Sequence, residues 1–280
     1  MKLTVTVITY NEAPHIASAL ESVAWADEIV VVDSNSTDGT ADIARRTASR
    51  VEVRDWPGYS AQKNYAADLA SHDWVLSLDA DERVSPALAE EIRGLMATGP
   101  AASGYRLPRV AWYLGRWVRS TDWYPDYQLR LYDRRAGRWN GRRVHESVTV
   151  NGPVGQLRHD LLHYPYRDIS DHLETIDRYT TLAAGQWHEE GRRARAWQAL
   201  VYPRLTFFRN YILKGGFRDG ETGLIVSLLN SEYVFLKYAK LLEFQHQPSN
   251  LEPRAPSPEP RRPSPEARAP NGERRVPNAD

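Results

Sequence analysis

The chain has 280 residues, in which 36 Lys and Arg balance 36 Asp and Glu, and it contains no cysteine. A net charge of zero gives no general attraction to nucleic acid, and the missing thiols exclude disulfides, cysteine nucleophiles and zinc–cysteine sites. The N-terminal segment has a strand pattern rather than a signal peptide, and no run of about 18 uncharged apolar residues follows. We therefore expect a cytoplasmic protein without a membrane-spanning helix.

The first hundred residues alternate between strand and helix patterns. We expect strands at 3–8, 28–33, 51–53 and 73–78, and helices at 12–23, 38–48, 60–70 and 86–96. The last helix begins with an N-cap serine, Ser85, and a first-turn proline, Pro86. This rhythm predicts an α/β fold with a mostly parallel sheet and right-handed crossovers.

The pattern changes after residue 100. Short strands are expected at 104–110, 128–132, 144–150 and 156–162, followed by helices at 170–188, 195–213 and 221–244. Nine of the eighteen prolines lie in the last 33 residues, where apolar side chains almost vanish. We therefore expect three regions: a catalytic α/β domain at 1–168, a helical region at 169–247, and a disordered tail at 248–280.

Polar residues follow three of the expected parallel strands. Asn11 comes after the first, Asp33 ends the second, and Asp79-Ala80-Asp81 ends the fourth. Ligands of open α/β sheets bind at this edge, so Asp33 is a candidate partner for a nucleotide base or ribose. The D-x-D pair suggests a divalent cation holding a diphosphate. The alternatives are a turn-capping role for Asp33 and a helix-entry charge cluster of Asp79, Asp81 and Glu82.

The segments 7–12, 31–40 and 78–82 resemble, in this order, the three signatures of inverting family 2 glycosyltransferases. The resemblance implies a GT-A fold, a nucleotide-diphospho-sugar donor, and Mg²⁺ or Mn²⁺. It places Thr9, Tyr10, Asn11, Glu12, Asp33 and Asp79 at the donor, and Asp81 on the metal. Later segments, 139–146, 163–166 and 214–220, are similar to a bacterial branch that glucosylates heptose in the lipopolysaccharide inner core. That branch implies a UDP-sugar donor, with glucose as the transferred hexose, and a glycan or glycolipid acceptor.

Inverting sugar transfer needs a base for the acceptor hydroxyl and positive charge for the leaving diphosphate. Glu146 is our first candidate base and Asp126 the second; Glu146 could instead pair with Arg142 or Arg143. Lys63 and Arg130 are candidate cations, or else ordinary surface charges. His163 could complete the metal site or be a structural histidine.

The helices after residue 190 combine arginines with aromatic side chains, a composition that suits an anionic membrane surface as well as packing on the catalytic domain. We expect peripheral contact with the inner face of the inner membrane. Two rival functions are a nucleotide-sugar-binding regulator without turnover and a glycosyltransferase for a protein or polyisoprenyl phosphate. A Rossmann dehydrogenase is disfavoured, because no G-x-G-x-x-G follows the first strand.

Overall fold

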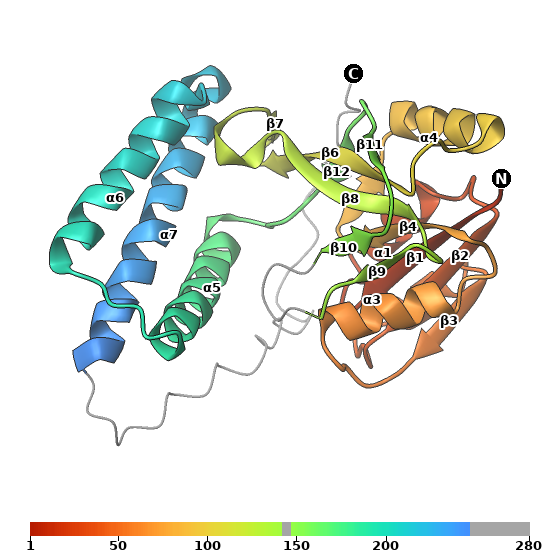
Figure 1. Ribbon diagram of the computed structural model, residues 1–280, viewed down its shortest axis with the longest axis horizontal. Coiled ribbons are helices and arrows are strands. Elements are labelled where there is room, and N and C mark those ends of the chain that lie inside the picture. The colour runs from red at the N-terminus through yellow and green to blue at the C-terminus, as the bar shows by residue number, and fades with distance from the viewer. Residues whose placement is uncertain (142–146, 247–280) are drawn as a thin grey trace, which may run out of the picture. The chain divides into compact units, whose positions relative to one another are not determined.

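The computed structural model describes residues 1–141 and 147–246. The chain divides into two compact units, residues 1–167 and the residues from 168 onward (Figure 1). Within the described residues, no helix combines the length and the apolar character needed to cross a membrane.

Four parallel strands form one half of the sheet in the first unit. Their order is β3 (Arg50–Val53), β2 (Glu28–Asp33), β1 (Leu3–Thr9) and β4 (Trp74–Asp79). Thr9 pairs with Asp33 on one side of β1, and Ile8 pairs with Asp79 on the other. This register brings the polar ends of three strands to one edge of the sheet.

Antiparallel and parallel pairs together extend the sheet beyond β4. The order continues with β8 (Asp126–Asp133), β6 (Gly104–Tyr113), β12 (Leu161–His163) and β5 (Glu82–Val84). β12 runs antiparallel to β5 and places His163 opposite Glu82. Short strands complete the unit: β7 (Arg116–Val118) and β11 (Val154–Gln156) pair with β6, and β9 (Gly137–Trp139) pairs with β10 (Val148–Val150).

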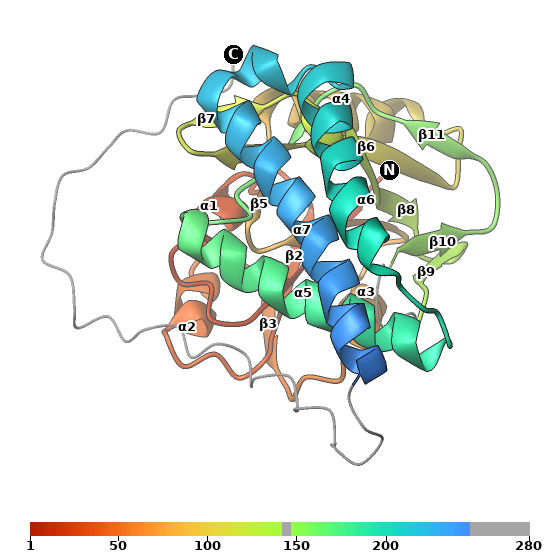
Figure 2. The same cartoon turned by 90° about the vertical axis from the view of Figure 1, so that its left-hand side faces the viewer.

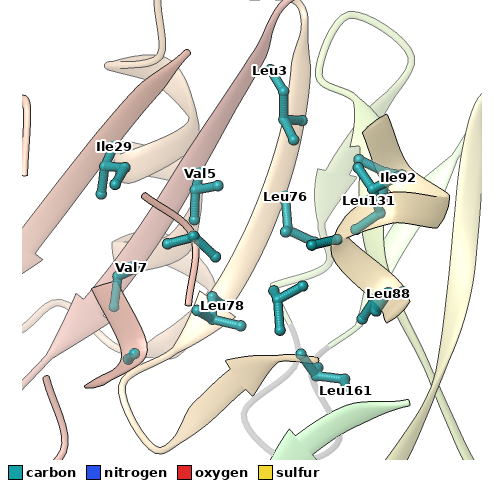
Figure 3. Close-up of a cluster of buried hydrophobic side chains, with 14 of the residues drawn as sticks. Leu3, Val5, Val7, Ile29, Leu76, Leu78, Leu88, Ile92, Leu131 and Leu161 are labelled. Carbon is teal, nitrogen blue, oxygen red and sulfur yellow. The ribbon is translucent and has the colours of Figure 1, made fainter. Parts of the chain in front are cut away.

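The core of this unit lies between the sheet and its helices (Figure 3). Every residue of β1 is buried, as expected for a parallel strand covered on both faces. Val5, Leu76 and Leu78 of the sheet contribute to the same apolar cluster as Leu88 and Ile92 of a helix. The helices of this unit are α1 (Ile16–Glu21), α2 (Thr40–Ala44), α3 (Tyr59–Asp68), α4 (Pro86–Thr98) and the 3₁₀ turn η1 (Thr121–Trp123).

The second unit is helical. α6 (Ala196–Phe208) runs beside α7 (Gly220–His246), and α5 (Ile169–Glu189) also packs on α7 (Figure 2). A π-helical turn, η2 (Arg209–Leu213), and a 3₁₀ turn, η3 (Gly216–Asp219), join α6 to α7. A Cβ atom on Gly223 would lie only 1.9 Å from the carbonyl oxygen of Gly216. Backbone therefore packs directly on backbone at this turn.

The α/β fold predicted from the sequence is confirmed, whereas several element boundaries are wrong. α1 begins at Ile16 rather than residue 12, and α2 ends at Ala44 rather than 48. The strand expected at 156–162 is two strands, β11 and β12, and β5, β7 and β9 were not expected. The strand expected at 144–150 begins outside the described residues, and its described part forms β10 at Val148–Val150. The tail expected at 248–280 lies wholly outside the described residues.

Candidate functional site

The loops after β1 and β2 bind each other at the carboxyl edge of the sheet. The Ser34 amide donates to the Thr9 carbonyl at 2.9 Å. Asn11 has a left-handed backbone with φ of 53°, and its side-chain oxygen accepts from the Thr37 amide at 2.9 Å. The Glu12 amide donates to the Thr40 hydroxyl at 2.8 Å. These bonds hold residues 10–13 in a loop. The helix expected from residue 12 therefore begins later, at Ile16.

Asp33 is completely buried at the end of β2. Its two carboxylate oxygens accept from the Ser36 amide at 2.8 Å and from the Ser36 hydroxyl at 2.5 Å. This is the turn-capping arrangement that the sequence left as an alternative. A carboxylate can accept about four hydrogen bonds, so these two bonds leave acceptor capacity for a nucleotide N–H or ribose hydroxyl. The donor-binding role of Asp33 stays a prediction.

Two buried cations hold Asp79 at the end of β4. The Lys63 ammonium lies 2.9 Å from Oδ1, and the Arg130 guanidinium lies 2.5 Å from Oδ2. Both cationic side chains are only 4% exposed, so neither is the surface charge considered as an alternative. Burial raises the pKa of Asp79, but Arg130 and Lys63 outweigh this effect and hold it well below its ordinary value. Asp79 is therefore ionised and fixed in place.

A second set of ion pairs continues from Arg130. Arg130 also donates to the buried Glu82 at 2.9 Å, and Glu82 accepts from Arg109 at 3.0 Å. Arg109 in turn donates to Asp126 at 2.9 and 2.6 Å. We call the six residues of this alternating chain the charge ladder: Lys63, Asp79, Arg130, Glu82, Arg109 and Asp126. Asp126, the second candidate base, thus stands at the end of the ladder, and Gln128 occupies its other oxygen at 2.7 Å.

Asp81 stands outside the ladder and faces His163. Its Oδ2 atom lies 3.4 Å from Nε2 of His163, and its carbonyl oxygen accepts from the Tyr164 amide. Burial raises the pKa of Asp81, but the His163 imidazole outweighs it, and the net pKa is lowered. The Asp81 side chain keeps 33% of its surface exposed, so a ligand can reach it.

The Asp81–His163 pair fits a hard divalent cation. Among the described residues, no group of three or more His, Cys, Asp or Glu side chains gathers as a metal cluster. However, Mg²⁺ keeps several waters and is often held by one or two carboxylates together with substrate phosphates. One reachable carboxylate with an imidazole beside it matches such a shared site, in which the diphosphate supplies further oxygens.

Unpaired buried polar atoms also mark this edge of the sheet. Thr9 Oγ1, Gln62 Oε1 and Arg130 Nε are buried and make no hydrogen bond within the described residues. Buried polar atoms in folded proteins normally have a partner. Thr9 and Arg130 belong to strands of the site, and Gln62 donates to Ser34 in the loop after β2. These atoms are therefore suited to contact a bound ligand.

Most of the predicted site residues lie at one edge of one sheet, but not all can be placed. Glu146, the first candidate base, lies outside the described residues. Tyr10 is exposed beside the first loop. Sequence reasoning missed Gln62 and Arg109, and considered Glu82 only as part of a charge cluster. Gln62 could have been noticed because it directly precedes Lys63, whereas Arg109 sits in an ordinary strand pattern and gives no signal of its own.

Comparison with known proteins identifies similar glycosyltransferases. The model of the family described as "Glycosyl transferase family 2" matches residues 4–151. A lipopolysaccharide core biosynthesis glycosyltransferase, LpsC of Rhizobium meliloti, is 32% identical over 250 residues, which cover 87% of this chain and 93% of LpsC. An uncharacterized glycosyltransferase of Rickettsia felis is 28% identical, over 86% of this chain and 90% of its own length.

Among solved structures, a mannosyltransferase from Pyrobaculum calidifontis in complex with GDP-Man and Mn²⁺ is 18% identical. The match covers 86% of this chain and 87% of that chain, with a TM-score of 0.49. The family match spans more than half of the chain, from β1 to the loop after β10, and includes the ends of β1, β2 and β4. The chain belongs to glycosyl transferase family 2 and is a glycosyltransferase with a GT-A fold.

Proposed function

We propose that this enzyme transfers a hexose, with inversion, from a nucleotide-diphospho-sugar to a hydroxyl of a lipopolysaccharide core glycan. We further propose UDP-glucose as the donor and Mg²⁺ or Mn²⁺ as the cofactor. The observation that carries the donor part is the reachable Asp81 carboxylate between His163 and the charge ladder. A diphosphate placed there would meet the metal site at Asp81, in the same region as the buried cations Lys63 and Arg130, which hold Asp79.

Asp81 and His163 would hold the divalent cation, whose chemistry is to neutralise charge that builds up on the leaving diphosphate. Asp79 cannot turn freely toward a ligand, since Lys63 and Arg130 hold both of its oxygens. It would therefore serve the ribose or a metal-bound water from a fixed position. Thr9 and the loop at 10–12 pair with Asp33 and the loop after it, and the base of the nucleotide would bind beside Asp33.

The transfer step itself needs one base and no protein nucleophile. The base accepts the proton of the acceptor hydroxyl while the oxygen bonds to the anomeric carbon. The bond from that carbon to the phosphate oxygen breaks, and the nucleoside diphosphate leaves with the electron pair. We propose Glu146 as the base. Asp126 is less suited, since Arg109 and Gln128 together already fill three of its about four acceptor positions.

The described residues on either side of 142–146 support this choice. The Asn140 amide donates to the Ser147 carbonyl at 2.9 Å, and Ser60 of α3 donates to the Asn140 carbonyl at 2.5 Å. Asn64 of α3 bonds both backbone groups of Trp139. The flanking residues are therefore anchored to the helix that carries Lys63.

The acceptor part of the proposal rests on the similarity to LpsC, which extends over 93% of that protein and thus includes the second unit. A core glycan is carried on lipid, so the acceptor would be a glycolipid. A cytoplasmic location with peripheral contact to the inner membrane stays a prediction.

Calorimetric titration of UDP tests the donor site. With Mn²⁺ we expect binding that weakens about tenfold or more in EDTA, because the cation joins Asp81 to the diphosphate. Asp81→Asn should bind UDP in Mn²⁺ as weakly as the wild type does in EDTA. Asp73→Asn is the matched control, since Asp73 is half exposed and pairs with Arg135. Equal UDP affinity with and without metal would refute the metal role.

A turnover assay separates this proposal from the regulator without activity. Nucleotide sugars are incubated with the enzyme and Mn²⁺, first with water and then with lipopolysaccharide core truncated before its hexoses. Release of UDP that increases with the acceptor supports the proposal. Tight UDP binding with neither transfer nor hydrolysis would instead favour the regulator, and transfer from another donor would correct the sugar.

A further inference from the structure

One face of α6 presents large apolar side chains to solvent. Trp197, Leu205 and Phe208 are 49%, 56% and 51% exposed, and Val201 lies between them. Their spacing of three to four residues places them on one side of the helix. The side toward α7 is different: Pro203 is buried, and its carbonyl accepts from Ser231 of α7 at 2.8 Å. We call Trp197, Val201, Leu205 and Phe208 the apolar stripe.

The charge around this stripe is entirely positive along the chain. Between Arg192 and Arg218 the sequence has seven Arg and Lys and no Asp or Glu. A contiguous exposed apolar patch on a protein surface is often an interaction site. A stripe that cations flank along the chain is complementary to a surface that is apolar inside and anionic outside, although one of these cations, Arg192, already pairs with Glu190 at 2.8 Å.

A hollow of about 340 Å³ lies next to the stripe, between α6 and α7. Leu205 of the stripe forms part of its rim, and Arg209 and Lys237 line it from the two helices. The Lys237 ammonium lies 4.4 Å from the centre of the Trp187 ring and near two tyrosine rings. Among the described residues, no carboxylate pairs with it. Burial and the nearby Arg192 lower its pKa, as expected for a cation without an anionic partner.

We propose that the apolar stripe and the Arg209–Lys237 hollow form a docking surface for an anionic lipid bilayer. The stripe enters the interface between headgroups and acyl chains, and a lipid phosphate occupies the hollow between the two cations. The aromatic rings around Lys237 keep its stem in place and leave the ammonium as a donor for phosphate oxygens. This surface lies within the second unit and involves no residue of the proposed donor site.

The test is flotation of the full-length protein with two kinds of vesicle, phosphatidylcholine alone and phosphatidylcholine mixed with phosphatidylglycerol. We expect flotation with the mixed vesicles at low salt, weaker flotation at high salt, and little with phosphatidylcholine alone, since salt screens the attraction of the cations. Flotation needs neither donor nor turnover, so its outcome is independent of the proposed function.

Two double variants locate the surface. Leu205→Glu with Phe208→Glu should lower vesicle partitioning about tenfold or more, because charged side chains cannot enter the interface. Leu173→Glu with Leu182→Glu is the matched control, since both leucines are similarly exposed but lie on α5.

The cations are tested in the same assay. Arg209→Gln with Lys237→Gln should lower partitioning about fivefold per cation, the equivalent of about 1 kcal/mol each near an anionic surface. Lys2→Gln with Arg46→Gln removes two exposed cations of the first unit and should change little.

Several results would overturn the proposal. One is failure of the folded wild type, checked by circular dichroism and UDP binding, to float with anionic vesicles at low salt. Another is an equal loss of flotation in the stripe variant and in its α5 control. A third is a dimer in light scattering that Leu205→Glu with Phe208→Glu converts to a monomer, which would assign the stripe to a second copy of the chain.

Discussion

The two units of this enzyme treat positive charge in opposite ways. In the first unit, Lys63, Arg109 and Arg130 are buried or nearly so, and each lies against a carboxylate. In the second unit, Lys237 lies against aromatic rings and has no carboxylate partner among the described residues. Paired buried charges hold side chains in place for chemistry, whereas a cation such as Lys237, which lies against aromatic rings, can donate to an external anion. In the two proposals above, the first unit carries out sugar transfer and the second unit binds the membrane.

The largest expected effect concerns turnover in the first unit. Glu146→Gln should lower kcat by about 10²- to 10⁴-fold, the usual contribution of a general base, and leave UDP affinity and melting temperature unchanged. Steady-state kinetics and calorimetry measure both. Asp126→Asn is the comparison variant: if it abolishes transfer without unfolding while Glu146→Gln stays active, Asp126 is the base.

A Glu→Gln substitution inside the charge ladder should lower the free energy of unfolding. Glu82→Gln leaves Arg109 and Arg130 without a shared carboxylate in a buried place, and removing one partner of a buried pair costs about 3–5 kcal/mol. Urea unfolding measures this. Glu52→Gln breaks a largely exposed pair with Arg50 and should cost less than about 1 kcal/mol. Equal costs for the two variants would show that the ladder does not stabilise the unit.

The second unit should respond to pH through a buried histidine of α5. Burial lowers the pKa of His172 to about 4, against an ordinary value of 6.5. Below pH 6.5 the unfolded chain takes up this proton before the folded chain does. The free energy of unfolding therefore falls as pH decreases from about 6.5 to 4, by at most about 3 kcal/mol.

Urea unfolding across this pH range checks the slope. His172→Gln should flatten it, whereas His188→Gln, an exposed position on the same helix, should keep it. A slope that is the same in wild type and His172→Gln would contradict the assignment.

The smallest effect is expected from the proline-rich C-terminal segment. Deleting residues 248–280 should change the melting temperature and transfer rate little, because the segment has too few apolar side chains to contribute a core. Differential scanning calorimetry and a transfer assay of the truncated chain test this. A drop of several degrees would mean that the segment stabilises one of the two units.

The sequence was enough to predict the parallel half of the sheet and the edge where the site lies. Continuous apolar runs such as Ile29–Val32 mark buried strands, and Asp33 and Asp79 follow such runs directly. Strand pairing then aligns these positions without further information. The structure also brings His163 to Asp81, as the metal hypothesis requires, although ligation by either residue remains untested.

The charge ladder could not be predicted in the same way. Its members Arg109, Asp126 and Arg130 come from β6 and β8, whose antiparallel register shifts between Tyr105 and Arg106. A shift of one residue moves every following side chain to the other face, and no pattern in the sequence announces it. The burial of Lys63 could not be predicted either, because the sequence pattern of a helix does not show whether a lysine side chain faces solvent or a carboxylate.

The close contact between Gly216 and Gly223 has a consequence for anyone who varies this enzyme. At Gly223 even a methyl group would overlap the carbonyl of Gly216, and a methyl at Gly216 would approach the Asn210 carbonyl at 3.0 Å. A saturation library over this turn should therefore return glycine alone at Gly223 and favour small residues at Gly216, whatever activity is selected. Diversity aimed at the helical unit is better spent on the exposed positions of α6, where side chains of any size can be accommodated without moving the helix pair.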